Sequence, residues 1–175
     1  MATSGVARWA AVRGGGIVIF VTVGTQLPFD RLIGAVDAWA GRSGRYDVLA
    51  QIGPSRLRPR FIEFRPFFSP EQFSRHFAEA ELVIAHAGMG SIIGAMSEGK
   101  PILVMPRYAS LHEHRNDHQR STALRFRESA RIMVAMDVAE LDAQLSRWES
   151  IPAACRVGNY ASPELLEAVR AFLCS

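Results

Sequence analysis

The sequence has few cysteines and no long apolar run. Among 175 residues there are only Cys155 and Cys174, which are far apart and outside any spacing typical of a metal site. This count argues against a disulfide framework and fits a reducing compartment. The apolar run Ile17–Val23 has seven residues, whereas a membrane-spanning helix needs about 18. Residues 1–16 lack the apolar core of a signal peptide. We therefore expect a soluble protein.

The net charge is small, and its positive part is almost entirely arginine. The 20 Lys+Arg against 17 Asp+Glu give +3, which does not by itself indicate a nucleic-acid-binding protein. Arginine can pair with phosphate through two parallel hydrogen bonds. The arginine content therefore fits phosphate binding, although a genome rich in G and C would explain it equally well.

Apolar segments alternate with helical patterns from residue 17 to about residue 148. Continuous β-branched runs predict strands that are buried on both faces. Apolar residues at helical spacing, with Ser69 and Asp137 as caps and Pro28 at the first helical position, predict the helices. The alternation predicts an α/β fold with a Rossmann-like, doubly wound, mainly parallel sheet. The expected strands are 17–23, 46–52, 60–64, 81–85, 101–106 and 131–135, and the expected helices are 28–42, 69–80, 91–98, 116–129, 137–148 and 162–173.

The most informative turn follows the expected strand 81–85. Ligands of such sheets bind beyond the carboxyl ends of the strands. A helix that begins near Gly90 and Ser91 presents free N–H groups and the positive end of its dipole to an anion. His86 stands at the strand end and can donate to a phosphate oxygen. The alternative is a core histidine bonded to a backbone carbonyl, beside a tight glycine turn.

Two more polar turns are expected at the same edge of the sheet. Gly24 and Thr25 follow the first strand, and Asn116, Asp117 and Gln119 open a later helix. Amide and carboxylate groups suit sugar hydroxyls, although Asn116 and Asp117 can also be ordinary helix caps. Three polar turns at one edge favour a nucleotide-sugar site.

Other motifs do not support a different function. The segment Gly94–Pro101 approaches a phosphate loop, but Pro101 replaces the Ser or Thr that binds Mg²⁺, and the order of helix and strand is reversed. Gly99 is better explained as a helix C-cap. "GMGSII" departs from the dinucleotide fingerprint at Ile93. No G-x-S-x-G motif supports a hydrolase.

The histidine-rich stretch "HEHRNDH" raises the question of a metal. His114 and His118 are four residues apart, so a helix can direct both toward one ion. No cysteine or carboxylate completes a familiar ligand set. We therefore expect no metal.

Four segments carry a resemblance to a known family. "VTVGTQLPFDRLI", "AHAGMGS", "GKPILVMPR" and "NDHQ" resemble the carboxy-terminal, donor-binding half of GT-B glycosyltransferases, of the family 28 type, over about residues 17–145. The chain is most similar to the small catalytic subunits of two-part UDP-sugar transferases. These include the eukaryotic subunit that helps add N-acetylglucosamine to the dolichol carrier, and bacterial exopolysaccharide enzymes. The resemblance implies a single GT-B half.

Matched position by position, the resemblance implies specific roles. It implies that Phe67 or Phe68 lies near the uracil and that Arg107 faces the diphosphate or the acceptor's phosphate. The residues implied to bind the donor diphosphate are Gly24, Thr25, His86, Gly88, Gly90 and Ser91, and those expected at the sugar are Asn116, Asp117 and Gln119.

Two positions depart from the family pattern. The family has a glutamate that binds ribose three residues after the serine of this motif, and this chain has Gly94 there. Glu98 lies one helical turn further on and is not expected to replace it from the same spot. His118 separates Asp117 from Gln119, which are adjacent in many relatives.

The resemblance implies an inverting glycosyltransferase subunit that passes a sugar from UDP to a lipid-linked acceptor, with no cofactor beyond the UDP-sugar co-substrate. The catalytic base and the acceptor groove would belong to a membrane-anchored partner subunit, so no catalytic residue is assigned here. The chain would be cytoplasmic, at the inner face of the membrane through that partner, and no nucleic acid is expected. The alternative is a non-catalytic nucleotide-sugar-binding or scaffold module.

We expect three parts along the chain. Residues 1–16 would be a flexible extension and residues 17–150 the nucleotide-sugar-binding domain. Residues 151–175 would form a C-terminal helical segment. Its apolar stripe would either dock the partner or cover the chain's own sheet. That stripe consists of Leu165, Leu166, Val169 and Phe172.

Overall fold

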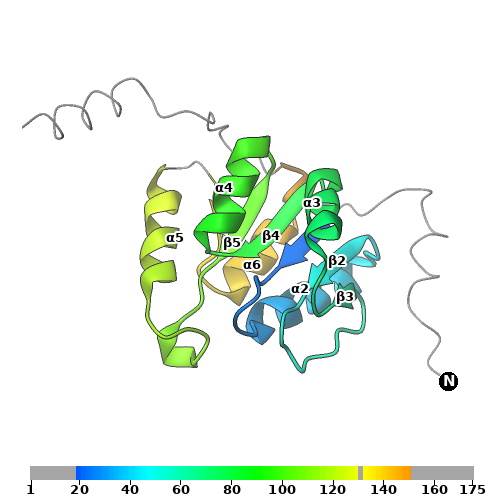
Figure 1. Ribbon diagram of the computed structural model, residues 1–175, viewed down its shortest axis with the longest axis horizontal. Helices are drawn as coiled ribbons and strands as arrows, with labels where there is room; N and C mark the ends of the chain where they lie inside the picture. Colours follow the sequence, from blue (N-terminus) through cyan, green and yellow to red (C-terminus); the bar gives the residue numbers. More distant parts are fainter. Residues whose placement is uncertain (1–18, 130–131, 151–175) are drawn as a thin grey trace, which may run out of the picture.

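The computed structural model describes residues 19–129 and 132–150 (Figure 1). The expected extension 1–16 and the segment 151–175 with its helix lie outside the described residues. The strands of the described part form one parallel sheet in the order β3-β2-β1-β4-β5-β6. This arrangement confirms the Rossmann-like α/β prediction. The strands are β1 Ile19–Thr22, β2 Val48–Gln51, β3 Glu63–Arg65, β4 Leu82–His86, β5 Ile102–Met105 and β6 Met133–Val134.

Helices cover both faces of the sheet (Figure 1). The helices are α2 Asp30–Ser43, α3 Pro70–Glu79, α4 Met89–Glu98, α5 His118–Ser129 and α6 Val138–Leu145, with short 3-10 turns η1 Ala109–Leu111 and η2 Trp148–Ser150. Apolar side chains of α2 and α6 pack with Ile19 and Val21 on one face. Those of α3, α4 and α5 pack with Phe20 on the other face. Successive strand residues point to opposite faces, which explains why β1 is buried throughout.

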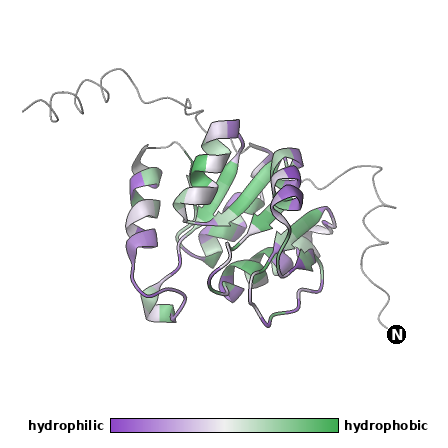
Figure 2. Cartoon of the chain, in the orientation of Figure 1, coloured by the Kyte–Doolittle hydropathy of each residue, from purple (hydrophilic) through white to green (hydrophobic). Residues whose placement is uncertain are grey.

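The hydropathy of the chain follows this layering (Figure 2). The central strands are mostly hydrophobic, whereas the edge strand β3 carries Glu63 and Arg65, and the helices carry hydrophilic residues. A strand that is covered on both sides must be apolar at every position. The continuous apolar runs in the sequence are the direct consequence.

The predicted caps of two helices are confirmed. The Ser69 hydroxyl accepts from the Gln72 N–H at 3.2 Å, and the Gln72 side chain accepts from the Ser69 N–H at 3.1 Å, so a full capping box begins α3. Asp137 accepts from the Glu140 N–H at 2.8 Å at the start of α6. Gly99 ends α4 with φ of 64°, as expected for a C-cap.

Two helix boundaries were predicted wrongly. Pro28 lies before α2 and not at its first position, because the first helical bond runs from the Ile33 N–H to the carbonyl of Phe29. Helix α6 ends at Leu145, three residues earlier than expected, and Trp148 lies in the 3-10 turn η2. There the Trp148 ring stacks under the guanidinium of Arg45, 4.5 Å from the ring centroid.

Candidate functional site

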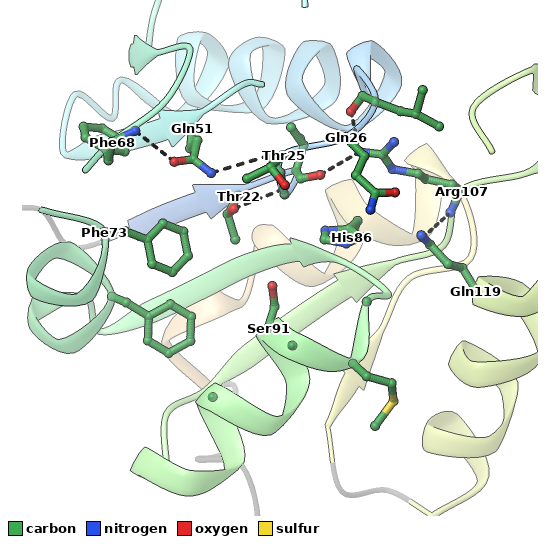
Figure 3. Close-up of a pocket in the computed structure, with 18 of the residues that line it drawn as sticks. Thr22, Thr25, Gln26, Gln51, Phe68, Phe73, His86, Ser91, Arg107 and Gln119 are labelled. Carbon is green, nitrogen blue, oxygen red and sulfur yellow. Dashed lines mark hydrogen bonds between the residues drawn. The ribbon is translucent and has the colours of Figure 1, made fainter. Parts of the chain in front are cut away.

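A cavity of about 770 Å³ lies at the carboxyl edge of the sheet. The ends of β1, β2, β4 and β5 and the loops that follow them meet there, as the parallel topology requires. Helices α3 and α4 complete the wall. In Figure 3, Phe68 and Phe73 lie at one end of the cavity, Arg107 and Gln119 at the other, and His86 between them. We call these the aromatic end and the polar end.

The N-terminus of α4 opens into the middle of the cavity. Its N-cap residue, Gly88, is extended and has no side chain, so no side-chain cap from the described residues satisfies the first N–H groups of the helix. Gly88, Gly90 and Ser91 all line the cavity. Free N–H groups and the positive end of the dipole make this turn suited to an anion.

The ring of His86 is seated between two glycine turns. A Cβ at Gly24 would lie 2.9 Å from Cε1 of His86, and a Cβ at Gly88 would overlap its Nε2. Gly24 also has φ of 76°, where L side chains are strained. Both glycines are therefore needed for the imidazole to occupy this position.

His86 is a neutral hydrogen-bonding group. Burial lowers the pKa of His86 to about 4, and the positive charge of Arg107 acts in the same direction. The backbone carbonyl of Thr22 opposes this shift, yet Nδ1 has no hydrogen-bond partner among the described residues. His86 lines the cavity, so its neutral ring is available to a ligand.

Arg107 connects two loops behind the cavity. Its Nη2 donates to the carbonyls of Val23 at 2.6 Å and Leu27 at 2.7 Å, and its Nη1 donates to the carbonyl of Glu113 at 3.3 Å. Only 2% of the residue is exposed. The resemblance implies that Arg107 faces a phosphate, but its terminal nitrogens are engaged by backbone carbonyls. Its charge thus lies at the polar end without a carboxylate bonded to it.

A second arginine, not identified from the sequence, reinforces the same connection. Arg31 makes two hydrogen bonds to the carboxylate of Glu113, at 2.8 and 2.7 Å, and donates to the carbonyl of Pro106 at 2.9 Å. The Glu113 carboxylate also accepts from the Tyr108 N–H at 3.0 Å. No local sequence motif predicts this network, because Arg31 and Glu113 are 82 residues apart in the chain.

The aromatic end is organised by Gln51, which sequence reasoning missed. Gln51 is 3% exposed. Its side-chain oxygen accepts from the Phe68 N–H at 3.0 Å, and its nitrogen lies 3.5 Å from the carbonyl of Gly24. It thereby joins the first glycine turn to the aromatic wall. Phe73 and Phe77, also missed, line this end; their spacing of four residues on α3 is a signal that can be read from the sequence.

Not every predicted residue lies on the cavity. Phe68 lines it, whereas Phe67 is 51% exposed and lies outside the lining. Gln119 lines it, and its side-chain oxygen accepts from the Arg107 N–H at 3.2 Å. Asn116 and Asp117 are outside the lining formed by the described residues. The Asp117 carboxylate instead accepts from the backbone N–H of Ala109 at 2.9 Å.

One face of helix α4 forms part of the cavity wall. Ser91, Gly94 and Glu98 lie on one face of α4 and all line the cavity. Glu98 is an exposed residue and has no hydrogen bond or ion pair within the described part of the chain. That it does not replace the ribose glutamate of the family stays a prediction. Glu98 lies about one turn after Gly94 on the same face of α4.

Neither a metal-binding cluster nor a membrane-spanning helix is found among the described residues. They contain no group of three or more His, Cys, Asp or Glu side chains placed to hold a metal ion. No helix within residues 19–129 and 132–150 is long and apolar enough to cross a membrane.

Residues 18–147 match the family model described as Glycosyltransferase family 28 C-terminal domain. The chain belongs to this family. The human protein "UDP-N-acetylglucosamine transferase subunit ALG13" is 30% identical to it over 106 residues, which cover 55% of this chain and 9% of the human protein. The chain thus matches less than two thirds of the length of that relative.

Solved structures share this fold. The NMR structure of ALG13 superposes with a TM-score of 0.58 at 18% identity, covering 89% of this chain and 95% of the other. Os79 from O. sativa, solved in complex with UDP, superposes with a TM-score of 0.57 at 16% identity, covering 86% of this chain and 35% of Os79. At these identities the likeness shows the fold. The resemblance to a GT-B donor-binding half is confirmed.

Proposed function

We propose that this family 28 domain is the donor-binding subunit of an inverting glycosyltransferase that uses a UDP-sugar. The observation that carries the proposal is the uncapped N-terminus of α4, which opens into a cavity between an aromatic end and a polar end. A nucleotide-sugar has the same three parts in the same order: a flat base, an anionic diphosphate and a hydroxyl-rich sugar. The names of two relatives support the nucleotide: ALG13 is a UDP-N-acetylglucosamine transferase subunit, and Os79 was solved with UDP.

The diphosphate would lie on the turn between His86 and Ser91. It would accept hydrogen bonds from the first N–H groups of α4, the Ser91 hydroxyl and the neutral His86 ring. Gly24, Thr25, Gly88 and Gly90 would let it approach the backbone. Donors that are already in place stabilise the charge that develops on the leaving diphosphate. The uracil would lie against Phe68.

The transfer itself needs a second protein. The acceptor hydroxyl oxygen would form a bond to the anomeric carbon while the bond from that carbon to the β-phosphate oxygen breaks, so UDP leaves. The hydroxyl proton must pass to a general base across the cleft. We place that base, and the groove for a lipid-linked acceptor, on a membrane-anchored partner subunit. The chain would then work at the cytoplasmic face of the membrane.

One observation favours a second candidate function. Gly94 brings no carboxylate to the wall of α4 where relatives have one, so the domain could bind a nucleotide-sugar without taking part in transfer. In that case it would serve as a scaffold or regulatory module.

Ligand binding tests the donor site directly. UDP and UDP-sugars should raise the melting temperature of the chain, and GDP- and TDP-sugars should raise it less. Ser91→Ala should weaken UDP binding by about 1 kcal/mol, the free energy of one hydrogen bond, and His86→Ala should also weaken it. Unchanged UDP affinity in both variants would contradict the diphosphate assignment.

A transfer assay separates the two candidate functions. The chain should transfer sugar to a lipid acceptor only when membranes that contain a candidate partner are added. Repeated turnover by the isolated chain would contradict the two-subunit proposal. UDP-sugar binding without transfer in the presence of any candidate partner would favour the non-catalytic module.

A further inference from the structure

The connection between β2 and β3 is a segment without regular secondary structure that lies along helix α2. Parallel strands such as these are usually joined by a helix, but residues 52–62 contain none. A Cβ at Gly34 would lie 3.9 Å from the side chain of Leu57, and a Cβ at Gly41 would overlap the ring of Phe61. Gly34 and Gly41 are about 10 Å apart along the helix axis. The chain from Leu57 to Phe61 covers a comparable distance in four residues, so it is largely extended.

The backbone of this segment is held by two carboxylates of α2. Asp37 accepts from the backbone N–H groups of residues 60–62 at 2.8 to 3.1 Å. The Ser55 hydroxyl donates to Asp30 and accepts from the Leu57 N–H at 2.9 Å. Both carboxylates therefore fix the position of the segment, and neither is bonded to an arginine side chain of it.

Three arginines alternate along the segment. Arg56, Arg58 and Arg60 are exposed, whereas Leu57 and Pro59 between them are half-buried. Successive side chains of an extended chain point to opposite sides, so the three guanidinium groups project from one side. We call them the arginine row. Arg58 donates to backbone carbonyls of the segment itself. Within the described residues none of the three forms an ion pair with a carboxylate.

We propose that the arginine row docks this domain on an anionic membrane surface, where the guanidinium groups bind lipid headgroups. A guanidinium pairs with a phosphate through two parallel hydrogen bonds, and a negatively charged leaflet attracts basic segments. Four backbone N–H groups of the segment are already bonded within the molecule. The segment therefore offers a partner its arginine side chains and is not suited to pair with a strand of another protein.

The choice of a bilayer over an acidic protein rests on the proposed function, which places the acceptor in a membrane. One arginine near an anionic surface strengthens binding about fivefold, and three strengthen it about a hundredfold. This attachment is weak for the chain alone. Beside a membrane-anchored partner it becomes a second contact within one complex, which raises the overall affinity. The row would then determine which side of the domain meets the membrane.

The test measures cosedimentation of the full chain with lipid vesicles. The chain should bind vesicles of phosphatidylcholine and phosphatidylserine at least tenfold more tightly than vesicles of phosphatidylcholine alone, and added salt should weaken the binding. Replacing Arg56, Arg58 and Arg60 together by glutamine should weaken it about a hundredfold, and each single replacement about fivefold. Replacing all three by lysine should change it by less than about threefold, because a diffuse surface charge attracts either cation.

A matched variant removes the same charge elsewhere. Arg115, Arg120 and Arg125 are exposed residues of α5 and the loop before it. Replacing these three by glutamine lowers the net charge equally, and it should weaken vesicle binding by no more than about fivefold, the share of one arginine. The melting temperature of each variant reports its folding. If the triple glutamine variant of the row is less stable, the three single variants replace it.

Several outcomes would overturn the docking surface. These are equal binding to anionic and neutral vesicles, an equal loss in the matched variant, and displacement from vesicles by inorganic phosphate at unchanged ionic strength, which would assign the row to free phosphate. Binding to polyglutamate without binding to vesicles would assign it to an acidic protein. None of the three arginines lines the cavity, so UDP should raise the melting temperature of every variant as it does that of the original chain. If UDP has no effect on any of them while the row still binds vesicles, the proposed function fails and the docking surface stands.

Discussion

The two ends of the cavity are held in different ways. At the aromatic end, Phe73 and Phe77 come from one helix, α3, which starts at bonds between residues only three apart. At the polar end, the loop that follows β5 is fixed by Arg31 and Arg107. All their hydrogen bonds except the one from Arg107 to the carbonyl of Glu113 reach partners 75 to 84 residues away along the chain. The helix at the aromatic end is specified by local sequence, with Gln51 joining this end to Phe68 and Gly24, whereas the polar end depends mainly on hydrogen bonds between residues far apart in the chain.

Because the two ends are held differently, we expect them to respond differently to the loss of a single side chain. A helix with a complete capping box and an apolar face tolerates the loss of single contacts. Its packing is stabilised by many weak van der Waals contacts, and each contributes little. A loop that is held by two guanidinium groups depends on each of them. Loss of a buried charged donor also leaves its carbonyl partners without hydrogen bonds.

The largest effect should come from Arg107→Ala. It removes a buried cation that donates to three backbone carbonyls, and hydrogen bonds to charged groups contribute about 1.5–3 kcal/mol. We expect the free energy of unfolding to fall by about 3 kcal/mol in urea titrations. Hydrogen exchange should show the loop 106–118 losing protection while α3 keeps it. Arg107→Lys, which keeps the charge without the planar fork, should lose less.

Equal loss of protection in α3 and in the loop would show that the two ends are not held separately. A loss of stability below about 1 kcal/mol would show that the carbonyls find other partners.

The second prediction concerns pH and the group between the two ends. The folded pKa of His86 is lowered to about 4, whereas an unfolded histidine has a pKa of about 6.5. Between these values the unfolded chain binds more protons than the folded one, so stability falls as pH falls from 6.5 toward 4. The contribution of His86 should be at most about 3 kcal/mol. His86→Gln should flatten the dependence of the unfolding free energy on pH in this window, and an unchanged slope would refute the assignment.

A smaller effect should follow from adding a Cβ at Gly88, where it would meet the His86 ring. In Gly88→Ala the new Cβ overlaps the His86 ring, and such overpacking costs about 1–3 kcal/mol. Gly90→Ala is the matched control, because a Cβ there meets no atom within 4 Å. Thermal unfolding should show a loss of stability for Gly88→Ala and none for Gly90→Ala. Adding His86→Ala to Gly88→Ala should restore most of the loss; if it does not, the ring is not the obstacle.

The contrast between the two ends also shows what the sequence can predict. The parallel sheet was predictable because each buried strand is a continuous apolar run, and α3 because Ser69, Pro70 and Gln72 specify its first turn within four residues. The glycine turn at His86–Ser91 was predictable for the same reason. Each of these features is encoded by neighbours in the chain.

The polar end could not be read in the same way. Arg31 carries no signal in the sequence, and the resemblance implied a phosphate contact for Arg107. Only the fold brings them to Glu113 and to the carbonyls of the first loop. The pair Asn116 and Asp117 was assigned to a sugar by residue type and by the resemblance of the "NDHQ" segment. Both side chains satisfy local groups of the loop, a competition that is common for Asn and Asp.

The smallest effect is expected at Gly94, on the wall of α4 near the aromatic end. A Cβ at Gly94 would lie 3.5 Å from Cζ of Phe77, an ordinary van der Waals contact, so a side chain fits. Glycine costs a helix interior about 0.5–1 kcal/mol relative to alanine. Replacing Gly94 by glutamate should stabilise the helix by part of that amount. Repulsion from Glu98, four residues later, should lower the stability by about 0.2–0.5 kcal/mol. The stability of Gly94→Glu should therefore hardly change.

Its UDP affinity should be unchanged or higher by up to about 1 kcal/mol, the free energy of one hydrogen bond to the ribose. Calorimetry with UDP and 2′-deoxy-UDP gives the measurement, because only UDP offers both ribose hydroxyls. Gly94→Gln is the control with the same length and no charge. A gain for UDP that is absent for the deoxy nucleotide would show that ribose lies over Gly94. A large loss of affinity for both nucleotides would show instead that the ligand needs the bare backbone of α4, and that ribose is bound elsewhere.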